Sequence, residues 1–198
     1  MLIPTDERIR ALHEKHAPTR KAYELVYTHC EIVCRIAEQI LARNGLGLDA
    51  GLVRAGSLLH DIGVYRLYDG DGEIDHAQYV RHGVLGDELL GEEGFPEAIR
   101  RFCSHHIGVG LSRDDIRRLG LPLPMADYVA ESGEERVVMY ADKFHSKTDP
   151  PTFVTAASYT ASVSRFGPDK AMVFTRICES FGEPDLTSLA AAYGHALA

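Results

Sequence analysis

Apolar residues recur at three- and four-residue steps along most of the chain, which is the spacing that gathers them on one face of an α-helix. The clearest stretch is residues 20–43, and Asn44-Gly45 predicts where its helix ends. Its inward positions form one stripe: Ala22, Leu25, Val26, His29, Ile32, Val33, Ile36, Ala37 and Ile40. The pattern therefore predicts a long amphipathic helix whose buried face carries a histidine.

The same periodicity predicts further helices, and no run of alternating apolar and polar residues predicts a strand. Residues 49–61 follow the capping residue Asp49 and stop at Gly63. The other predicted helices span 74–91, 96–106, 133–147, 152–166 and 168–181, with a short one closing the chain. Residues 64–73 predict a polar loop, and residues 108–131 a loop or lid with a short helix at 113–119. An all-α fold with a single domain over residues 1–198 is expected.

Composition and charge narrow the classes of function. The chain has 198 residues, 45% of them hydrophobic, which suffices for one domain with a sizeable core. Its net charge is −8, so we expect no general nucleic-acid binding, because an acidic surface repels phosphate backbones. No apolar run approaches the roughly 20 residues that span a bilayer, and the first residues lack the apolar stretch of a signal peptide. A cytoplasmic protein without a membrane segment is expected.

The four cysteines show no paired motif. Cys30, Cys34, Cys103 and Cys178 lack CxxC spacing, so we expect small core residues. Cys30 and Cys34 lie one helical turn apart, which leaves metal binding by this pair as an alternative.

Histidines and aspartates fall on the predicted inward faces of several helices. His60 shares the inward stripe of residues 49–61, and Asp61 follows it at the helix end. A carboxylate there is repelled by the negative end of the helix dipole, and a bound metal cation would offset this repulsion. His82, His106 and Asp142 also share faces with apolar residues. Such sets of imidazoles and carboxylates suit zinc, manganese or iron and not calcium.

The order of these residues resembles the HD superfamily of metal-dependent phosphohydrolases. The resemblance covers residues 20–150 and includes His60-Asp61-Ile62-Gly63, the HDIG form that names one subgroup. Three further segments resemble small HDIG-domain proteins: His82-Gly83-Val84-Leu85-Gly86, His106-Ile107-Gly108 and Tyr140-Ala141-Asp142-Lys143. The resemblance implies an HD-domain helical bundle with its core at 20–150 and packing helices at 151–198.

The resemblance also implies a ligand set. His29, His60, Asp61 and Asp142 would bind one metal ion, and His82 and His106 a second, with Asp61 bridging the two. His105 would join His82 and His106 as a ligand if the chain resembles the subgroup in which both of the paired histidines bind metal. The cofactor is one or two divalent transition-metal ions, with Fe, Mn, Zn, Co or Ni as candidates.

The function that the resemblance implies is hydrolysis of a phosphate ester or anhydride by metal-activated hydroxide. The expected partner is a nucleotide or another small phosphorylated metabolite, and the glycine-rich signatures of cyclic-di-GMP phosphodiesterases are absent after His106. Asp61 would orient the nucleophile, and Lys143 is the first candidate for a phosphate contact, ahead of Arg81 and Lys147. His105 and His145 are candidates for general acids or for groups that orient a ligand. His76 is expected at the surface.

Two other functions stay open. A few HD-fold proteins hold two irons and use dioxygen to cleave C–P or C–C bonds with the same ligand set, and a non-catalytic ligand sensor is the third class. A homo-oligomer is also possible. We expect the segments 64–73 and 108–131 to set substrate choice, since both follow predicted metal ligands.

Overall fold

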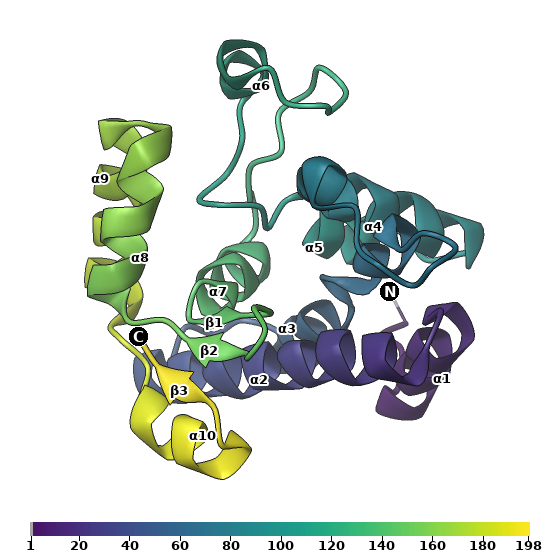
Figure 1. Cartoon of the computed structure of the whole chain (residues 1–198). Coiled ribbons are helices and arrows are strands. Elements are labelled where there is room, and N and C mark those ends of the chain that lie inside the picture. Colours follow the sequence, from purple (N-terminus) through teal and green to yellow (C-terminus); the bar gives the residue numbers. More distant parts are fainter. Residues whose placement is uncertain (1) are drawn as a thin grey trace.

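The structure, a computed structural model, describes residues 2–198. Within them lie ten α-helices, three short 3₁₀ helices and one three-stranded sheet of two-residue strands, so the all-α prediction is confirmed (Figure 1). The α-helices are α1 (Asp6–His16), α2 (Arg20–Asn44), α3 (Ala50–Leu59), α4 (His82–Glu92), α5 (Glu97–Ser104), α6 (Arg113–Leu119), α7 (Gly133–Asp142), α8 (Ala156–Val163), α9 (Pro168–Phe181) and α10 (Leu186–Tyr193). The 3₁₀ helices are η1 (Ile62–Leu67), η2 (His76–Arg81) and η3 (Ser164–Phe166), and the strands are β1 (His145–Ser146), β2 (Thr152–Phe153) and β3 (Ala196–Leu197).

Helix α2 is the longest helix; it runs along the lower side of the molecule in Figure 1 and contributes to both large apolar cores. Its first half packs with α1, α3, α4 and α5, and its second half packs with α7, β2, α8 and α9. Thr19 caps its start by accepting a hydrogen bond from the Ala22 amide, and Gly45 ends it in the left-handed conformation, as the sequence predicts. Cys30, Cys34 and Cys103 lie buried as free thiols. Helix α2 therefore links the two cores.

Several predicted boundaries are wrong. The expected helix 74–91 is split, because η2 ends at Arg81 and α4 begins at His82. The expected helix 133–147 ends at Asp142, and His145–Ser146 form β1 instead. The strands have two residues each, too short to show an alternating pattern, so periodicity could not reveal them. Helix α1, capped by Thr5, lies outside the predicted elements.

The small sheet joins distant parts of the chain. Strand β1 pairs antiparallel with β2, and β2 pairs parallel with β3. His145 is in register with Phe153, and Phe153 with Leu197. The sheet therefore holds residues near 145 and residues near 196, about fifty positions later, on either side of β2.

The segment 108–131 carries α6 at the predicted position and projects from the rest of the molecule (Figure 1). An antiparallel bridge between Leu111 and Tyr128 closes its base. Lys170 on α9 ties the segment down through its ammonium group, which lies 2.6 Å from Asp115 Oδ2 and 3.0 Å from the Gly110 carbonyl oxygen. No helix within residues 2–198 is long and apolar enough to cross a membrane.

Candidate metal centre

Six predicted ligand residues reach the centre of the molecule from five elements. His29 lies in the middle of α2, His60 and Asp61 directly follow α3, and His82 is the first residue of α4. His106 lies two residues beyond α5, and Asp142 is the last residue of α7. Helix ends can direct a side chain along the helix axis as well as sideways, which lets several helices share one point. The structure thus brings these six side chains together.

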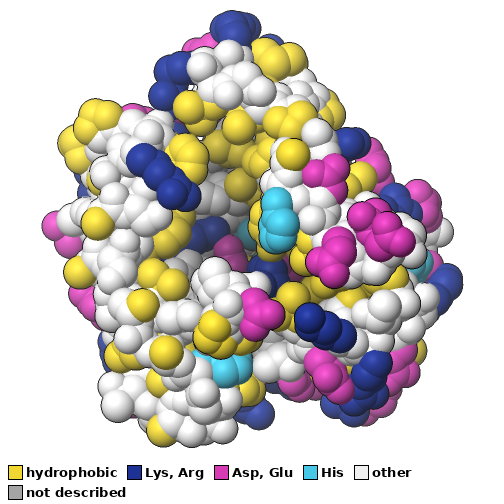
Figure 2. Space-filling view, in the orientation of Figure 1, with side chains coloured by type: hydrophobic (Ala, Val, Ile, Leu, Met, Phe, Trp, Pro, Cys, Tyr) yellow, Lys and Arg dark blue, Asp and Glu magenta, His cyan; other side chains and the backbone are white. Residues whose placement is uncertain are grey.

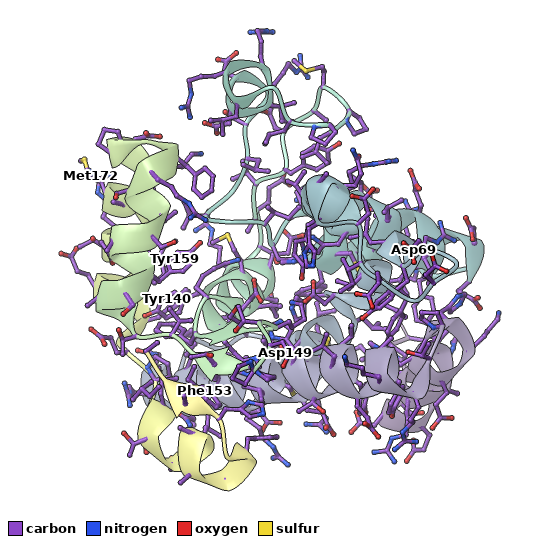
Figure 3. All side chains as sticks on the ribbon, viewed as in Figure 1. Asp69, Tyr140, Asp149, Phe153, Tyr159 and Met172 are labelled. Carbon is purple, nitrogen blue, oxygen red and sulfur yellow. The ribbon has the colours of Figure 1, made fainter. Side chains whose placement is uncertain are left out.

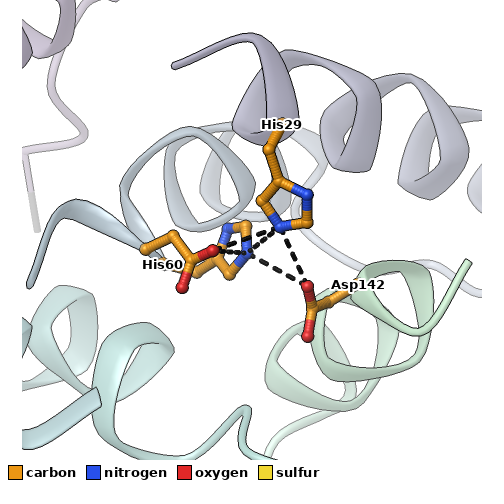
Figure 4. Close-up of side chains that lie close together, drawn as sticks. His29, His60 and Asp142 are labelled. Atoms are coloured by element: carbon orange, nitrogen blue, oxygen red, sulfur yellow. Dashed lines mark hydrogen bonds and ion pairs between the residues drawn. The ribbon is translucent and has the colours of Figure 1, made fainter. Parts of the chain in front are cut away.

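The first group consists of His29, His60, Asp61 and Asp142. His29 Nε2 lies 3.0 Å from Asp142 Oδ1, 3.2 Å from Asp61 Oδ2 and 3.2 Å from His60 Nε2 (Figure 4). His60 Nε2 lies 3.4 Å from Asp142 Oδ1 and 3.6 Å from Asp61 Oδ2. Ligand atoms bonded to one ion at about 2.1 Å are about 3.0–3.4 Å apart at coordination angles of about 90–109°. The observed separations therefore suit a single transition-metal ion.

The second group consists of Asp61, His82 and His106. His82 Nε2 and His106 Nε2 lie 3.0 Å apart, and they lie 3.3 Å and 3.5 Å from Asp61 Oδ1. Asp61 thus turns Oδ2 to the first group and Oδ1 to the second. This is the arrangement of a carboxylate that bridges two ions.

Three of the histidines are oriented by backbone carbonyl oxygens. The Nδ1–H groups of His60, His82 and His106 donate to the carbonyl oxygens of Ser57, Tyr79 and Phe102, at 2.7, 2.6 and 3.0 Å. In a neutral ring of this kind Nε2 carries a lone pair and no proton, whereas Asp61, against the effect of burial, raises the pKa of His60 well above its usual range. Burial lowers the pKa of His106 and lowers that of His82 to about 3, so both rings are neutral.

The second group therefore places two nitrogen lone pairs and a carboxylate oxygen face to face. Asp61 Oδ1 is buried and makes no hydrogen bond to any partner within residues 2–198. A buried carboxylate oxygen without a partner is costly, and a cation would satisfy it together with both lone pairs. The residues present fit a divalent metal ion.

Two lysines balance the two carboxylates. Lys143 Nζ donates to Asp142 Oδ2 at 2.6 Å and to the His106 carbonyl oxygen at 2.9 Å, and Lys147 Nζ donates to Asp61 Oδ2. Burial by itself would raise the pKa of Asp61, but Lys147 and then His60 hold it well below its usual range. Burial likewise opposes ionisation of Asp142, and Lys143 and then His29 hold its pKa well below its usual range. Both aspartates are anionic and ready to bind a metal.

His29 differs from the other three histidines because its Nδ1 faces a side chain. His29 Nδ1 lies 2.9 Å from His145 Nδ1, and His145 Nε2 lies 3.0 Å from His195 Nδ1. Burial, followed by His29 and His195, lowers the pKa of His145 to about 2, so this ring is neutral. His195 is a residue that the sequence pattern does not single out.

The other predicted residues lie outside the two groups. His105 Nδ1 is 2.8 Å from Ser104 Oγ, and its ring contacts Tyr128 edge to face. Arg81 is half-buried at the end of η2. His76 is exposed, as expected, and lies at the edge of a cavity.

This cavity has a volume of about 230 Å³ and adjoins the first group through Lys147. Its lining residues are Leu25, Val64, Ile74, His76, Tyr79, Ser146, Lys147 and Thr148. Val64 belongs to the predicted loop 64–73 and Ile74 directly follows it, and none of the lining residues belongs to 108–131. Elsewhere, Figure 2 shows a hollow between the α6 segment, the α8–α9 pair and α4–α5, with acidic and basic side chains at its floor. Sequence periodicity indicates neither feature.

A mostly helical bundle in which one carboxylate lies between two sets of histidines is a domain that could hold metal ions. The family model for the HD domain matches residues 26–147, which include all six of these side chains. The chain belongs to the HD-domain family.

The proteins that resemble this chain in sequence do so over only part of their own length. An uncharacterised protein of Methanocaldococcus jannaschii is 36% identical over 122 residues, which are 60% of this chain and 65% of that protein. The tRNA (cytidine(56)-2'-O)-methyltransferases of Picrophilus torridus and Thermoplasma volcanium are 34% and 32% identical. Those matches cover 65% and 61% of this chain but 33% and 32% of the methyltransferases.

Solved structures share the fold. The HD domain of the phosphodiesterase PgpH from L. monocytogenes superposes with a TM-score of 0.56 at 18% identity, over 95% of this chain and 100% of that one. The same domain in complex with cyclic-di-AMP gives a TM-score of 0.55 at 19% identity, over 94% and 97% of the two chains. At this identity the likeness establishes the HD fold and no more.

Proposed function

We propose that this protein is a metal-dependent phosphohydrolase of the HDIG type that cleaves a phosphate ester or anhydride of a nucleotide or related small metabolite. The observation that carries the proposal is Asp61, whose two oxygens are divided between two groups of buried imidazoles. One or two ions of Fe, Mn, Zn, Co or Ni suit these ligands. Two such ions would supply hydroxide near neutral pH and offset the charge that builds on the phosphoryl oxygens.

The side chains around the ligands divide the remaining work. Lys143 is buried and already bonded to Asp142 and to the His106 carbonyl oxygen, so its part is to hold those two ligands in place. Lys147 bonds Asp61 and also lines the cavity, so it can contact a phosphate that enters there. We therefore place Lys147 ahead of Lys143 as the phosphate contact.

The cavity suits the non-phosphate part of a small substrate. Tyr79 and His76 offer aromatic faces, and Leu25, Val64 and Ile74 offer apolar ones. Such a surface accepts a flat ring, while Lys147 marks the end nearest Asp61. The likeness to a phosphodiesterase domain crystallised with cyclic-di-AMP supports a nucleotide ester as the class of substrate.

The test begins with metal analysis of protein purified without oxygen, followed by assays after reconstitution with each candidate metal. Phosphate release from nucleoside mono-, di- and triphosphates, cyclic nucleotides and dinucleotides, and dinucleoside polyphosphates is measured. We expect turnover of at least one substrate that chelation abolishes and metal restores. Metal-dependent oxygen uptake without phosphate release would favour the oxygenase, and tight nucleotide binding without turnover would favour the sensor.

The matched variant is Asp61→Asn, which keeps the shape of the side chain and removes its charge. We expect turnover to fall at least about 100-fold while the helical content stays the same, because a bridging ligand supports the chemistry more than the fold. Asp114→Asn is the control, since the Asp114 side chain is 87% exposed and pairs with Arg117 on the surface. Activity of Asp61→Asn within a few-fold of wild type would remove Asp61 from the mechanism.

A further inference from the structure

A row of three histidines runs outward from the first group. His29 and His145 face each other through their Nδ1 atoms at 2.9 Å, and His145 Nε2 continues to His195 Nδ1 at 3.0 Å. The ring planes differ by 31° at the first contact and by 24° at the second. His29 and His145 are buried, whereas His195 is half-buried. The row thus links a proposed ligand to the molecular surface.

Each nitrogen–nitrogen contact needs one donor and one acceptor, which fixes the direction of the row. If His29 Nε2 faces a metal, its proton sits on Nδ1 and is donated to His145 Nδ1. The proton of His145 must then sit on Nε2, which donates to His195 Nδ1. A single arrangement of protons satisfies both contacts and leaves the His29 lone pair free.

This support differs in kind from that of the other ligands. His60, His82 and His106 donate to backbone carbonyl oxygens, which can act only as acceptors. His145 can present either a lone pair or a proton at Nδ1, depending on its tautomer. The acceptor at His195 Nδ1 decides between the two, because it engages the proton on His145 Nε2.

The small sheet holds the row together. Strand register places His145 beside Phe153, and Phe153 beside Leu197, two residues after His195. The Ala198 amide donates to the Phe153 carbonyl oxygen at 2.9 Å. The Phe153 ring, labelled in Figure 3, lies with its centroid 5.0 Å from that of His145 and 6.0 Å from that of His195. His195 lies outside the matched HD residues 26–147, so this support comes from beyond the matched domain.

We infer that His145 and His195 are positioning residues of the metal centre: the row fixes the tautomer of His29 and so strengthens metal binding. The inference rests on the proposed metal site. It makes residues 195–198 part of the centre, where the sequence predicts only packing helices after residue 150. Partners that orient a metal-bound histidine typically contribute 10- to 100-fold in metal affinity.

The test is calorimetric titration of the full chain with Zn²⁺, using variants matched at each position. His145→Leu and His195→Leu remove the contacts. His145→Asn and His195→Asn place a carbonyl oxygen, which can only accept, where Nδ1 stood. We expect about 10- to 100-fold weaker binding for His145→Leu, about 3- to 10-fold weaker binding for His195→Leu, and affinity within about threefold of wild type for both Asn variants.

A double variant separates this role from general packing. In the His145→Asn background the acceptor facing His29 no longer depends on a tautomer, so adding His195→Leu should cost no further affinity. Long-range ¹H–¹⁵N spectra of the Zn²⁺-loaded protein, with His29 assigned through His29→Gln, should show its proton on Nδ1 in the wild type and in both Asn variants. His195→Leu should broaden or shift that signal. Circular dichroism melts check that every variant is folded.

The outcomes distinguish this inference from the proposed function. Wild-type protein that binds no metal would overturn both. Wild-type protein that binds Zn²⁺, with equal affinity and an unchanged His29 signal in His195→Leu, would overturn the inference alone. An equal loss from His195→Leu in the wild-type and His145→Asn backgrounds would also overturn it, since packing and not tautomer would then be the cause. Because His195 is half-buried, this variant tests the inference even if His145→Leu does not fold.

Discussion

Replacing Gly63 by alanine tests how two segments that carry candidate metal ligands are held together. Gly63 lies in η1, two residues after Asp61, where η1 packs against the start of α4. A Cβ atom at this position would lie 2.1 Å from the His82 carbonyl oxygen, 2.3 Å from the Gly86 amide nitrogen and 2.7 Å from Gly86 Cα. All three are backbone atoms, so no flexible side chain can move aside.

The cost follows from the need to shift a helix. Overpacking a well-packed interior typically costs 1–3 kcal/mol, and displacing the backbone of α4 belongs at the upper end, about 3 kcal/mol. For a chain of this size each kcal/mol lowers the melting temperature by roughly 2–4 °C, so we expect a fall of about 6–12 °C. His82 begins α4, so its distance from Asp61 must change as well, and binding of a second metal ion should weaken.

Thermal melts of metal-free protein measure the first effect, and Zn²⁺ titration measures the second. The control is Gly70→Ala, because a Cβ atom there would have no neighbour within 4 Å, and we expect stability within about 0.5 kcal/mol of wild type. A melting temperature of Gly63→Ala within roughly 2 °C of wild type would refute the reasoning, because that is the smallest shift expected for a loss of about 1 kcal/mol. It would mean that η1 and α4 separate at little cost.

Three further predictions concern the cavity, the second metal and a buried histidine. Lys147→Met should raise the KM of a phosphorylated substrate by about 10- to 100-fold, which corresponds to the loss of a hydrogen bond to a charged group. Lys147→Arg should restore part of the lost affinity, and an unchanged KM in Lys147→Met would count against the phosphate contact. His82→Ala should lower the Zn²⁺ stoichiometry from two to one, and a wild-type stoichiometry of one would contradict the second site. Burial lowers the pKa of His13 to about 4, against about 6.5 in an unfolded chain. Below pH 6.5 the unfolded state therefore binds a proton that the folded state does not, and the free energy of unfolding falls as the pH falls toward 4. This residue should account for about 2.5 kcal/mol of the loss between pH 7.5 and 4.5, and urea melts of His13→Gln with the same pH dependence as wild type would contradict that.

Helical phase explains why the candidate ligands could be predicted from the sequence. A buried stripe at three- and four-residue steps specifies which way a side chain points, and His29 lies in the longest such stripe. His60 could be placed by the same argument, because Asp49 caps the start of α3, although the helix ends at Leu59 and the predicted stop, Gly63, lies within η1. What the phase could not give was the way in which Asp61 divides its two oxygens between the groups, since that depends on the relative positions of several helices.

The pattern also misjudged the region after Asp142. Residues 143–147 continue the apolar spacing of α7, yet the chain leaves the helix there and turns Lys143 to Asp142 and Lys147 to Asp61. Burying two carboxylates requires counter-charges in contact, and this need outweighs a few residues of helix propensity. Ranking the two lysines as phosphate contacts therefore required their tertiary contacts, which no local sequence pattern predicts.

The amino-acid sequence by itself determined the helical class, the inward faces of the long helices and the order of the candidate metal ligands. These depend on spacings of three or four residues, over which the geometry of the α-helix is fixed. Tertiary structure alone decided which side chains meet across long stretches of chain. His195 reaches His145 through strands of two residues, and Lys147 reaches Asp61 across 86 positions. Such contacts depend on how whole elements pack. The free energy that stabilises them is shared among many residues, so no single segment of the sequence predicts them.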